Sequence, residues 1–313
     1  MADAAGDRAS EVTNIRLLIC HTTIARTKVR VAAVMEVVSL LRNLSPKALP
    51  GGPLSEQKGV FWVTVPAEHL ERAQERLPRL GYTQAVDVLV AIPESEWRRN
   101  TPGLVRWQKQ PYRVERLYES DSDRLRDRAP DRRTFLLETG AGEVRSVTGY
   151  RGDGRRALPV IDACLLVNLV FSAQGGVFLD PFAGAGGVVI EAINAGYMVL
   201  SGDIDPSLRF GLAELGARHT IFDAKALPFP DNSLDAIATE PPYDRDTTLT
   251  VARAVVEMAR VLKPGGRIAL LCARWQADLL RRAGQQAGLV SFFEVDIDRK
   301  GTDCTALAWT KPD

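Results

Sequence analysis

A glycine-rich turn follows the predicted buried strand Val177–Asp180, with glycines at Gly184, Gly186 and Gly187. Glycines let the backbone approach a ligand closely, and the predicted helix after the turn presents free N–H groups at its N-terminus. This geometry suits a nucleotide-like cofactor. A dinucleotide site or a plain strand-to-helix turn would show the same glycines, so the neighbouring strands must decide which ligand the turn holds.

Acidic residues end the next two predicted strands of the chain. Asp203 ends the strand Met198–Asp203, and a carboxylate there can accept hydrogen bonds from both hydroxyls of a ribose. Asp223 ends the strand Thr220–Asp223, where an acid can accept the amino group of an adenine. Because ligands of such sheets bind at the carboxyl ends of the strands, we expect both acids beside the glycine-rich turn. Either acid taken alone could be an ordinary solvated loop residue.

The segment Glu240–Tyr243, with the sequence Glu-Pro-Pro-Tyr, follows the fourth predicted strand, Leu234–Thr239. It resembles the Asp/Asn-Pro-Pro-Tyr signature of methyltransferases that act on exocyclic amino groups of nucleic-acid bases. Such a nitrogen is a poor nucleophile because its lone pair is delocalised into the ring. An acceptor side chain and a backbone carbonyl can hold its two N–H bonds, and positioning then supplies much of the rate. The prolines stiffen the backbone, and Tyr243 can stack on an extruded base.

Glu240 departs from this signature, which has Asp or Asn at the first position. Glu is one methylene longer, so its carboxylate reaches a different point from the same backbone. The departure leaves open the catalytic geometry and the target base. It also leaves open the interpretation that the protein binds the cofactor and RNA without transferring a methyl group. The remaining interpretation is that Glu240–Tyr243 is only a rigid surface turn.

The order of these motifs resembles the THUMP-associated RNA methyltransferases, in particular the tRNA guanosine-10 N2-methyltransferases of archaea and eukaryotes. This resemblance implies S-adenosylmethionine as the cofactor and N2 of guanosine in tRNA as the methyl acceptor. The alternative enzymes are DNA methyltransferases that act on adenine N6 or cytosine N4, but no separate target-recognition domain is evident. The matching stretches cover the C-terminal half of the chain: Gly154–Leu169, Asp180–Gly187, Gly202–Asp205, Asp223–Ala224 and Ala238–Tyr243.

The resemblance also implies roles for individual residues. Asp180 and the glycines after it would line the methionine part of the cofactor, Asp203 would hold the ribose, and Asp223 with Ala224 would hold the adenine. The complete predicted cofactor-binding set is Asp180, Phe182, Gly184, Gly186, Asp203, Ile204, Asp223 and Ala224. The predicted catalytic set, which would hold the target amino group and its base, is Glu240, Pro241, Pro242 and Tyr243.

Residues 158–313 alternate regularly between predicted strands and helices. The pattern predicts an α/β fold of the Rossmann-like methyltransferase type, with a seven-stranded, mostly parallel sheet and an antiparallel hairpin at one edge. The predicted strands are Val177–Asp180, Met198–Asp203, Thr220–Asp223, Leu234–Thr239, Arg267–Cys272, Val290–Ile297 and Cys304–Thr310. The predicted helices are Pro159–Phe171, Gly187–Ala195, Pro206–Leu215, Thr248–Leu262 and Trp275–Ala287.

Residues 13–93 predict a smaller N-terminal α/β domain of ferredoxin-like type. Its role in binding RNA would rest on analogy alone. The strands are expected at Ile15–Cys20, Val60–Val65 and Thr83–Ile92, the helices at Arg26–Leu41 and Ala67–Leu80, and a loop at Leu44–Lys58.

Residues 94–157 predict a basic connecting region, with 15 Arg and Lys against 11 acidic residues. Aromatic rings are interleaved with these charges, as in segments that follow a phosphate backbone and stack on bases. A solvated connector whose charges pair with one another fits the same composition, especially over Arg124–Arg133. The composition does not decide between the two.

The bulk composition is that of an ordinary globular protein, with a net charge of +1 that neither demands nor excludes a nucleic-acid partner. No two of the four cysteines have a zinc-ligand spacing, so we expect no metal and reduced thiols. No apolar run approaches the ~20 residues of a membrane span. Residues 1–12 lack the apolar core of a signal peptide and predict a disordered tail, so the expected location is cytoplasmic. Nothing in the sequence fixes the oligomeric state.

Overall fold

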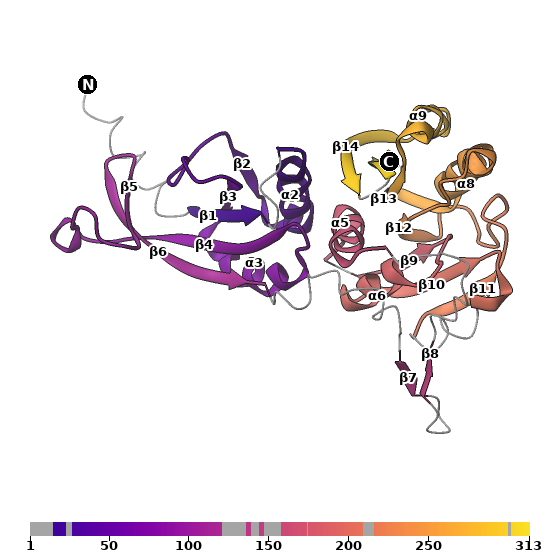
Figure 1. The fold of residues 1–313 in the computed structure, drawn as a ribbon, viewed down its shortest axis with the longest axis horizontal. Helices are drawn as coiled ribbons and strands as arrows, with labels where there is room; N and C mark the ends of the chain where they lie inside the picture. Colours follow the sequence, from indigo (N-terminus) through magenta and orange to yellow (C-terminus); the bar gives the residue numbers. More distant parts are fainter. Residues whose placement is uncertain are drawn as a thin grey trace. The chain divides into compact units, whose positions relative to one another are not determined.

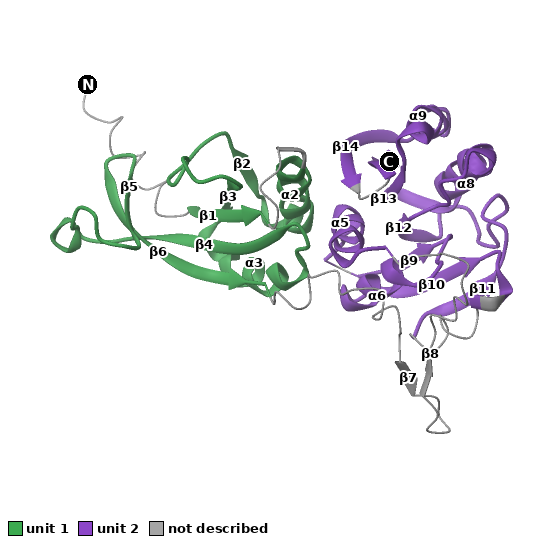
Figure 2. Ribbon diagram, in the orientation of Figure 1, with its two compact units in different colours: residues 1–125 green, residues 126–313 purple. Residues whose placement is uncertain are grey.

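The structure is a computed structural model that describes residues 15–22, 27–120, 136–138, 144–146, 158–173, 175–208, 216–299 and 302–313. It divides into two compact units, an N-terminal unit of residues 1–125 and a C-terminal unit of residues 126–313 (Figure 1, Figure 2). The predicted tail at residues 1–12 lies outside the described residues. So does most of 121–157, where only the short strands β7 (Leu136–Glu138) and β8 (Val144–Ser146) are described.

The N-terminal unit is built on a six-stranded antiparallel sheet with the order β2-β3-β1-β4-β6-β5. One helix connects β1 to β2 and another connects β3 to β4, which is the β-α-β-β-α-β order of the predicted ferredoxin-like fold. The elements are β1 (Ile15–Thr22), α2 (Thr27–Leu40), β2 (Lys47–Leu49), β3 (Val60–Pro66), α3 (Leu70–Arg76), β4 (Thr83–Ala91), β5 (Leu104–Trp107) and β6 (Gln110–Glu119).

The hairpin β5–β6 lies in the region that the sequence assigns to a connector. β6 pairs with β4 along its length, and Tyr112 of β6 joins the core cluster of Ile19 and Trp62, so the hairpin extends the N-terminal unit beyond the predicted boundary at residue 93. Its turn residues, Gln108 and Lys109, both have positive φ, at 48° and 68°. Such turns usually contain Asn or Gly, and their absence hides the hairpin in the sequence.

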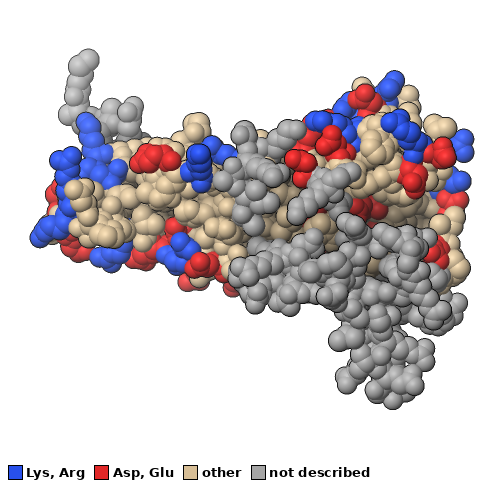
Figure 3. Space-filling view, in the orientation of Figure 1, with Lys and Arg blue, Asp and Glu red and all other residues tan. Residues whose placement is uncertain are grey.

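Arg106 and Arg113 of the hairpin pair with acids of the 3-10 turn that precedes it, η4 (Glu94–Glu96). Arg106 forms an ion pair with Glu94, and Arg113 forms one with Glu96 at 3.0 Å. Figure 3 shows basic and acidic side chains side by side at the end of the unit that carries β5. This part of residues 94–157 therefore fits the salt-bridged interpretation. A further difference is β2, which lies within the predicted loop Leu44–Lys58 and has only three residues, too few to show an alternating pattern.

The C-terminal unit contains the predicted seven-stranded sheet, with the order β11-β10-β9-β12-β13-β15-β14. The strands from β11 to β13 are parallel, and β15 pairs antiparallel with both β13 and β14, which confirms the hairpin at one edge. The strands are β9 (Val177–Asp180), β10 (Met198–Asp203), β11 (Arg218–Ile221), β12 (Leu234–Thr239), β13 (Leu262–Ala273), β14 (Val290–Arg299) and β15 (Thr302–Thr310). The helices are α5 (Val160–Val170), α6 (Gly187–Asn194), α8 (Thr248–Val261) and α9 (Ala277–Gln286).

Several boundaries in this unit differ from the predictions by one to five residues, and one predicted helix is described only in part. β11 ends at Ile221, so Asp223 lies in the following loop and not in the strand. β13 begins at Leu262, before the predicted start at Arg267, because Leu262 already pairs with Leu234 of β12. The Pro-Gly-Gly segment between these residues interrupts the regular pairing, and Gly265 there has φ of 71°. Of the predicted helix Pro206–Leu215, only a 3-10 turn at Pro206–Leu208 lies within the described residues.

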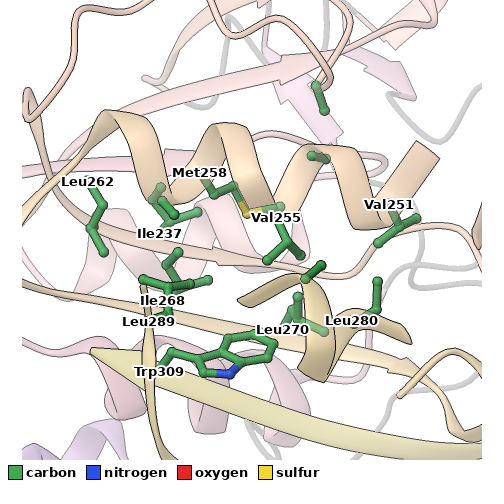
Figure 4. Packing of buried hydrophobic residues seen from close by; sticks show 14 of the residues in the cluster. Ile237, Val251, Val255, Met258, Leu262, Ile268, Leu270, Leu280, Leu289 and Trp309 are labelled. Atoms are coloured by element: carbon green, nitrogen blue, oxygen red, sulfur yellow. The ribbon is translucent and has the colours of Figure 1, made fainter. Parts of the chain in front are cut away.

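A buried core holds the strand ends of this unit in place. In Figure 4, Val255 and Met258 of α8 pack against Ile237 of β12 and Ile268 of β13. Trp309 of β15 belongs to the same buried cluster. All five side chains are at most 1% exposed. Because the strand order reverses between β9 and β12, the crevice at their carboxyl ends is the expected ligand position in a sheet of this kind.

Candidate active site

Asp180, the last residue of β9, lies at this carboxyl edge of the sheet, where the strand order reverses, and is 1% exposed. Its Oδ1 accepts a hydrogen bond from the Thr239 hydroxyl at 2.6 Å and one from the Phe182 N–H at 3.2 Å. Burial raises the pKa of Asp180 to about 7, the two hydrogen bonds oppose that rise, and the charges of Asp203 and Glu240 add to it. Thr239 ends β12, so this contact joins the two strands at the reversal point.

Asp203, the last residue of β10, binds the glycine-rich turn through its side chain. Its Oδ2 accepts the Gly184 N–H and its Oδ1 accepts the Asp205 N–H, each at 3.0 Å. Gly184 and Gly186 have φ of 49° and 84°, a conformation that glycine adopts without strain, and Gly186 caps the N-terminus of α6. Each carboxylate oxygen can accept a second hydrogen bond, so Asp203 keeps the capacity to bind ribose hydroxyls.

The loop after β11 crosses the end of β10 at Gly202. A Cβ atom at Gly202 would lie 2.0 Å from the Phe222 ring, so only glycine permits this approach. Phe222 packs edge-on against Phe229, with ring centroids 5.8 Å apart. The contact brings Asp223 next to Asp203, although sequence analysis did not assign a role to either Gly202 or Phe222. A glycine inside a predicted strand was the available signal.

The remaining predicted cofactor residues lie on the same loops. Asp223 accepts the Lys225 N–H at 3.0 Å and forms an ion pair with the Lys225 ammonium at 3.3 Å. Ala224 is buried, whereas Ile204 is 68% exposed directly beside Asp203. An exposed apolar side chain at this position can cover one face of a planar ring. Phe182 packs partly buried against the core of the unit.

The Glu240–Tyr243 turn leaves the carboxyl end of β12. The Tyr243 hydroxyl donates a hydrogen bond to Oε1 of Glu240, so the motif's own tyrosine holds the longer carboxylate. Pro241 is buried, and Pro242 and Tyr243 are partly exposed. The electrostatic effect of Glu240 on Asp180 shows that this turn lies close to the end of β9.

Gln276 also binds this turn, and sequence analysis did not assign it a role. It ends the 3-10 turn η8 (Arg274–Gln276) after β13 and is completely buried. Its Nε2 donates to the Pro242 carbonyl at 2.9 Å, and its Oε1 accepts the Ala273 N–H at 3.0 Å. A Gln three residues after a cap position can indicate local capping, but nothing in the sequence indicates the bond to Pro242.

The acids of the crevice fit a cationic cofactor. Asp203 and Glu240 each interact unfavourably with the Asp180 carboxylate, and a positive charge among them would relieve that repulsion. S-adenosylmethionine carries such a charge on its sulfur, and it has the ribose and adenine groups that suit Asp203 and the loop after β11. Among the described residues, no group of His, Cys, Asp and Glu is placed to hold a metal ion. Nor does any helix of the described ranges have the length and apolar character needed to cross a membrane.

Comparison with known proteins identifies the class of this fold. Residues 179–270 match a protein family described as a methyltransferase domain. Over 129 residues the chain is 35% identical to the tRNA (guanine(10)-N2)-dimethyltransferase of Pyrococcus abyssi. This alignment covers 36% of this chain and 38% of that protein. Over 122 residues the chain is 35% identical to the demethylmenaquinone methyltransferase of Roseiflexus castenholzii. That alignment covers 37% of this chain and 50% of the relative. The chain thus spans half or less of the length of these relatives.

A solved structure of a geranyl diphosphate methyltransferase in complex with S-adenosylmethionine aligns with 49% of this chain and 86% of its own, with a TM-score of 0.42 and 16% identity. The family match and the strand order together define a Rossmann-like methyltransferase domain in the C-terminal unit, and its cofactor is S-adenosylmethionine. The curated relatives carry the names of different substrates, so they agree on the class of reaction and not on the acceptor.

Proposed function

We propose that this protein is an S-adenosylmethionine-dependent methyltransferase that modifies an exocyclic amino group of a nucleic-acid base, with N2 of guanosine in tRNA as the favoured acceptor. The observation that carries the proposal is the Glu240–Tyr243 turn at the end of β12, beside Asp180. The partial relatedness to a tRNA guanine-N2 enzyme supports the choice of base.

The cofactor would lie across the carboxyl ends of β9, β10 and β11. Asp180 with Phe182, Gly184 and Gly186 would surround its methionine part. Asp203 would accept the ribose hydroxyls, and the adenine would lie between Ile204 and the Asp223–Ala224 loop. Bound S-adenosylmethionine supplies a methyl group on a positively charged sulfur. The acids of the crevice stabilise that charge in the bound state.

The target base would enter over the Glu240–Tyr243 turn. The Glu240 carboxylate would accept one N–H of the amino group and the Pro241 carbonyl the other, which aims the nitrogen lone pair at the methyl carbon. The Tyr243 ring would stack on the base while its hydroxyl holds Glu240. As the N–C bond forms and the S–C bond breaks, the sulfur would leave as a neutral thioether, and the nitrogen would give up one proton to the Glu240 carboxylate.

The proposal is tested by incubating the protein with S-adenosylmethionine that carries a labelled methyl group and with unmodified tRNA, rRNA or DNA. The nucleic acids are then digested to nucleosides, and the methylated nucleoside is identified by mass spectrometry. We expect N2-methylguanosine in tRNA. N6-methyladenine or N4-methylcytosine in DNA would replace the proposed acceptor with the alternative one. Binding of S-adenosylmethionine without transfer to any of the three would contradict the enzymatic assignment and favour a non-catalytic binding module.

A further inference from the structure

The side chain of Gln276 connects two loops that carry different parts of the site. One end of its amide binds the backbone of Ala273, at the end of β13, and the other binds the Pro242 carbonyl, 34 residues earlier in the chain. Because the Ala273 N–H can only donate, it fixes the amide oxygen on its own side. The amide NH₂ group must then face Pro242. A buried amide with both ends bonded has a single orientation.

The other donor near the Pro242 carbonyl is a weak one. The Thr247 hydroxyl lies 3.4 Å from that oxygen but 2.7 Å from the Asp244 carbonyl. A hydroxyl has one hydrogen, so it donates chiefly to Asp244. Gln276 therefore provides the main hydrogen bond to the Pro242 carbonyl.

We propose that Gln276 is a positioning residue for methyl transfer, which acts by holding the Pro242 carbonyl and so orients the Glu240–Tyr243 turn; this inference rests on the proposed function. The Pro242 carbonyl lies in the peptide plane between Pro242 and Tyr243, so its hydrogen bond to Gln276 fixes that plane. The ring of Pro242 restricts the φ angle that links this plane to the one carrying the Pro241 carbonyl. The Pro241 carbonyl and the Glu240–Tyr243 hydrogen bond then keep one geometry towards the acceptor base. An error of about 1 Å in such a geometry costs on the order of 100-fold in rate.

Two substitutions separate the two hydrogen bonds of Gln276. Gln276→Glu keeps an acceptor for the Ala273 N–H and loses the donor to Pro242 at neutral pH, whereas Gln276→Met loses both. We expect both variants to bind S-adenosylmethionine like the wild type and to lower kcat on tRNA about 10- to 100-fold, with little change in KM for tRNA. Gln285→Met, at an exposed position of the same helix-turn segment, is the matched control and should leave kcat unchanged.

A loss of rate in Gln276→Met without a loss in Gln276→Glu would overturn the proposal, because the side chain would then only cap η8. A higher KM for tRNA at unchanged kcat would also overturn it.

Hydrogen exchange of the wild type and both variants, without any RNA, keeps this test independent of the proposed function. We expect faster exchange in peptides that span residues 240–247 and no change in those that span 180–187. If the wild type methylates no nucleic acid, the proposed function fails, whereas this exchange pattern would still show that Gln276 holds the turn. Unchanged exchange in both variants would overturn the inference whatever the acceptor.

Discussion

Each of the two units buries an aspartate, and the two aspartates are treated in opposite ways. Asp87 of β4 is 5% exposed and accepts a hydrogen bond from His21 at 2.8 Å and another from Arg116. Burial opposes its ionisation, but these two partners outweigh burial and lower the pKa of Asp87. Asp180 is buried more deeply, at 1% exposed, and this burial is the main cause that raises its pKa to about 7. Its hydrogen-bond partners are a hydroxyl and an N–H, which lower the pKa too little to offset burial, and the nearby charges of Asp203 and Glu240 raise it further.

This contrast separates an acid whose charge is balanced within its own unit from one for which we propose a role in binding the cofactor. The charge of Asp87 is balanced within the N-terminal unit and stabilises its sheet. The charge of Asp180 is not balanced by the groups around it, which is typical of sites that complete themselves with a ligand. The antiparallel sheet distributes its charges as local pairs, whereas the parallel sheet gathers carboxylates at the edge where its strands end.

The largest expected effect concerns cofactor binding. Asp180→Ala and Asp203→Ala should each weaken S-adenosylmethionine binding by about 100-fold or more, because each removes a charged hydrogen-bonding group from the crevice. Asp87→Ala should leave the affinity unchanged. Titration calorimetry measures all three, and circular dichroism checks that the variants are folded. Normal affinity in both Asp180→Ala and Asp203→Ala would break the comparison.

Turnover should depend on the Tyr243 hydroxyl more than cofactor affinity does. Tyr243→Phe keeps the ring but releases the Glu240 carboxylate, so we expect kcat to fall about 10-fold, the effect of one hydrogen bond to a charged group. Tyr243→Ala also removes the stacking surface and should lower kcat further. Steady-state methylation of tRNA, with cofactor affinity measured in parallel, checks both. Equal rates for Tyr243→Phe and the wild type would show that the hydroxyl does not position Glu240.

Stability should change in opposite directions when the two acids are replaced. Asp87→Asn should destabilise the protein by about 1–3 kcal/mol at pH 7.5, since a charged hydrogen-bond network is lost. Asp180→Asn should stabilise the cofactor-free protein by about 1 kcal/mol at the same pH, because an uncompensated buried charge is removed. Urea unfolding of both variants measures the difference. Loss of stability in Asp180→Asn would mean that its charge is compensated after all.

The pH dependence of this effect follows from the raised pKa of Asp180. The folded state holds the Asp180 proton up to about pH 7, whereas the unfolded chain releases it at a pH of ~4. The stabilising contribution of Asp180 is therefore fully present below a pH of ~4 and is lost as the pH rises to about 7. The stability gained by Asp180→Asn should grow over this interval and be constant above it. A gain that does not vary with pH would contradict the raised pKa.

The smallest effects belong to the surface pairs of the β5–β6 hairpin. Glu96→Gln removes the exposed partner of Arg113 and should change the free energy of unfolding by less than about 1 kcal/mol. Cofactor affinity should not change. Thermal unfolding and calorimetry check this, and a large loss of tRNA binding or turnover in this variant would give the hairpin a role beyond the stability of the sheet.

The catalytic sheet was predictable because its signals are local. β9, β10 and β12 each carry a short apolar run, and Asp180, Asp203 and Glu240 stand at the carboxyl ends of these strands or directly after them. Parallel strands bring such positions together whatever the loops between them contain. Asp180, Asp203 and Glu240 could therefore be expected close together from the sequence, and the effect of Asp203 and Glu240 on the pKa of Asp180 shows that the three lie near one another.

The features that sequence analysis missed depend on contacts between distant residues or on unusual turns. Gln276, after β13, binds Pro242, after the neighbouring strand β12, and Phe222, in the loop after β11, packs on Gly202. The β5–β6 hairpin turns at two residues that rarely adopt positive φ, and β6 alternates charges that mask its apolar face. In each case the tertiary partner decides the role of the residue, and its own sequence neighbourhood does not.

The most direct test compares cofactor binding and methyl transfer in the same samples of four proteins: the wild type, Asp203→Ala, Pro241→Ala and Tyr243→Ala. The account predicts that the wild type binds S-adenosylmethionine and methylates tRNA guanosine at N2. Asp203→Ala should do neither, and the two turn variants should bind the cofactor without transferring its methyl group. Undiminished transfer by both Pro241→Ala and Tyr243→Ala would contradict the claim that the Glu240–Tyr243 turn is the active site.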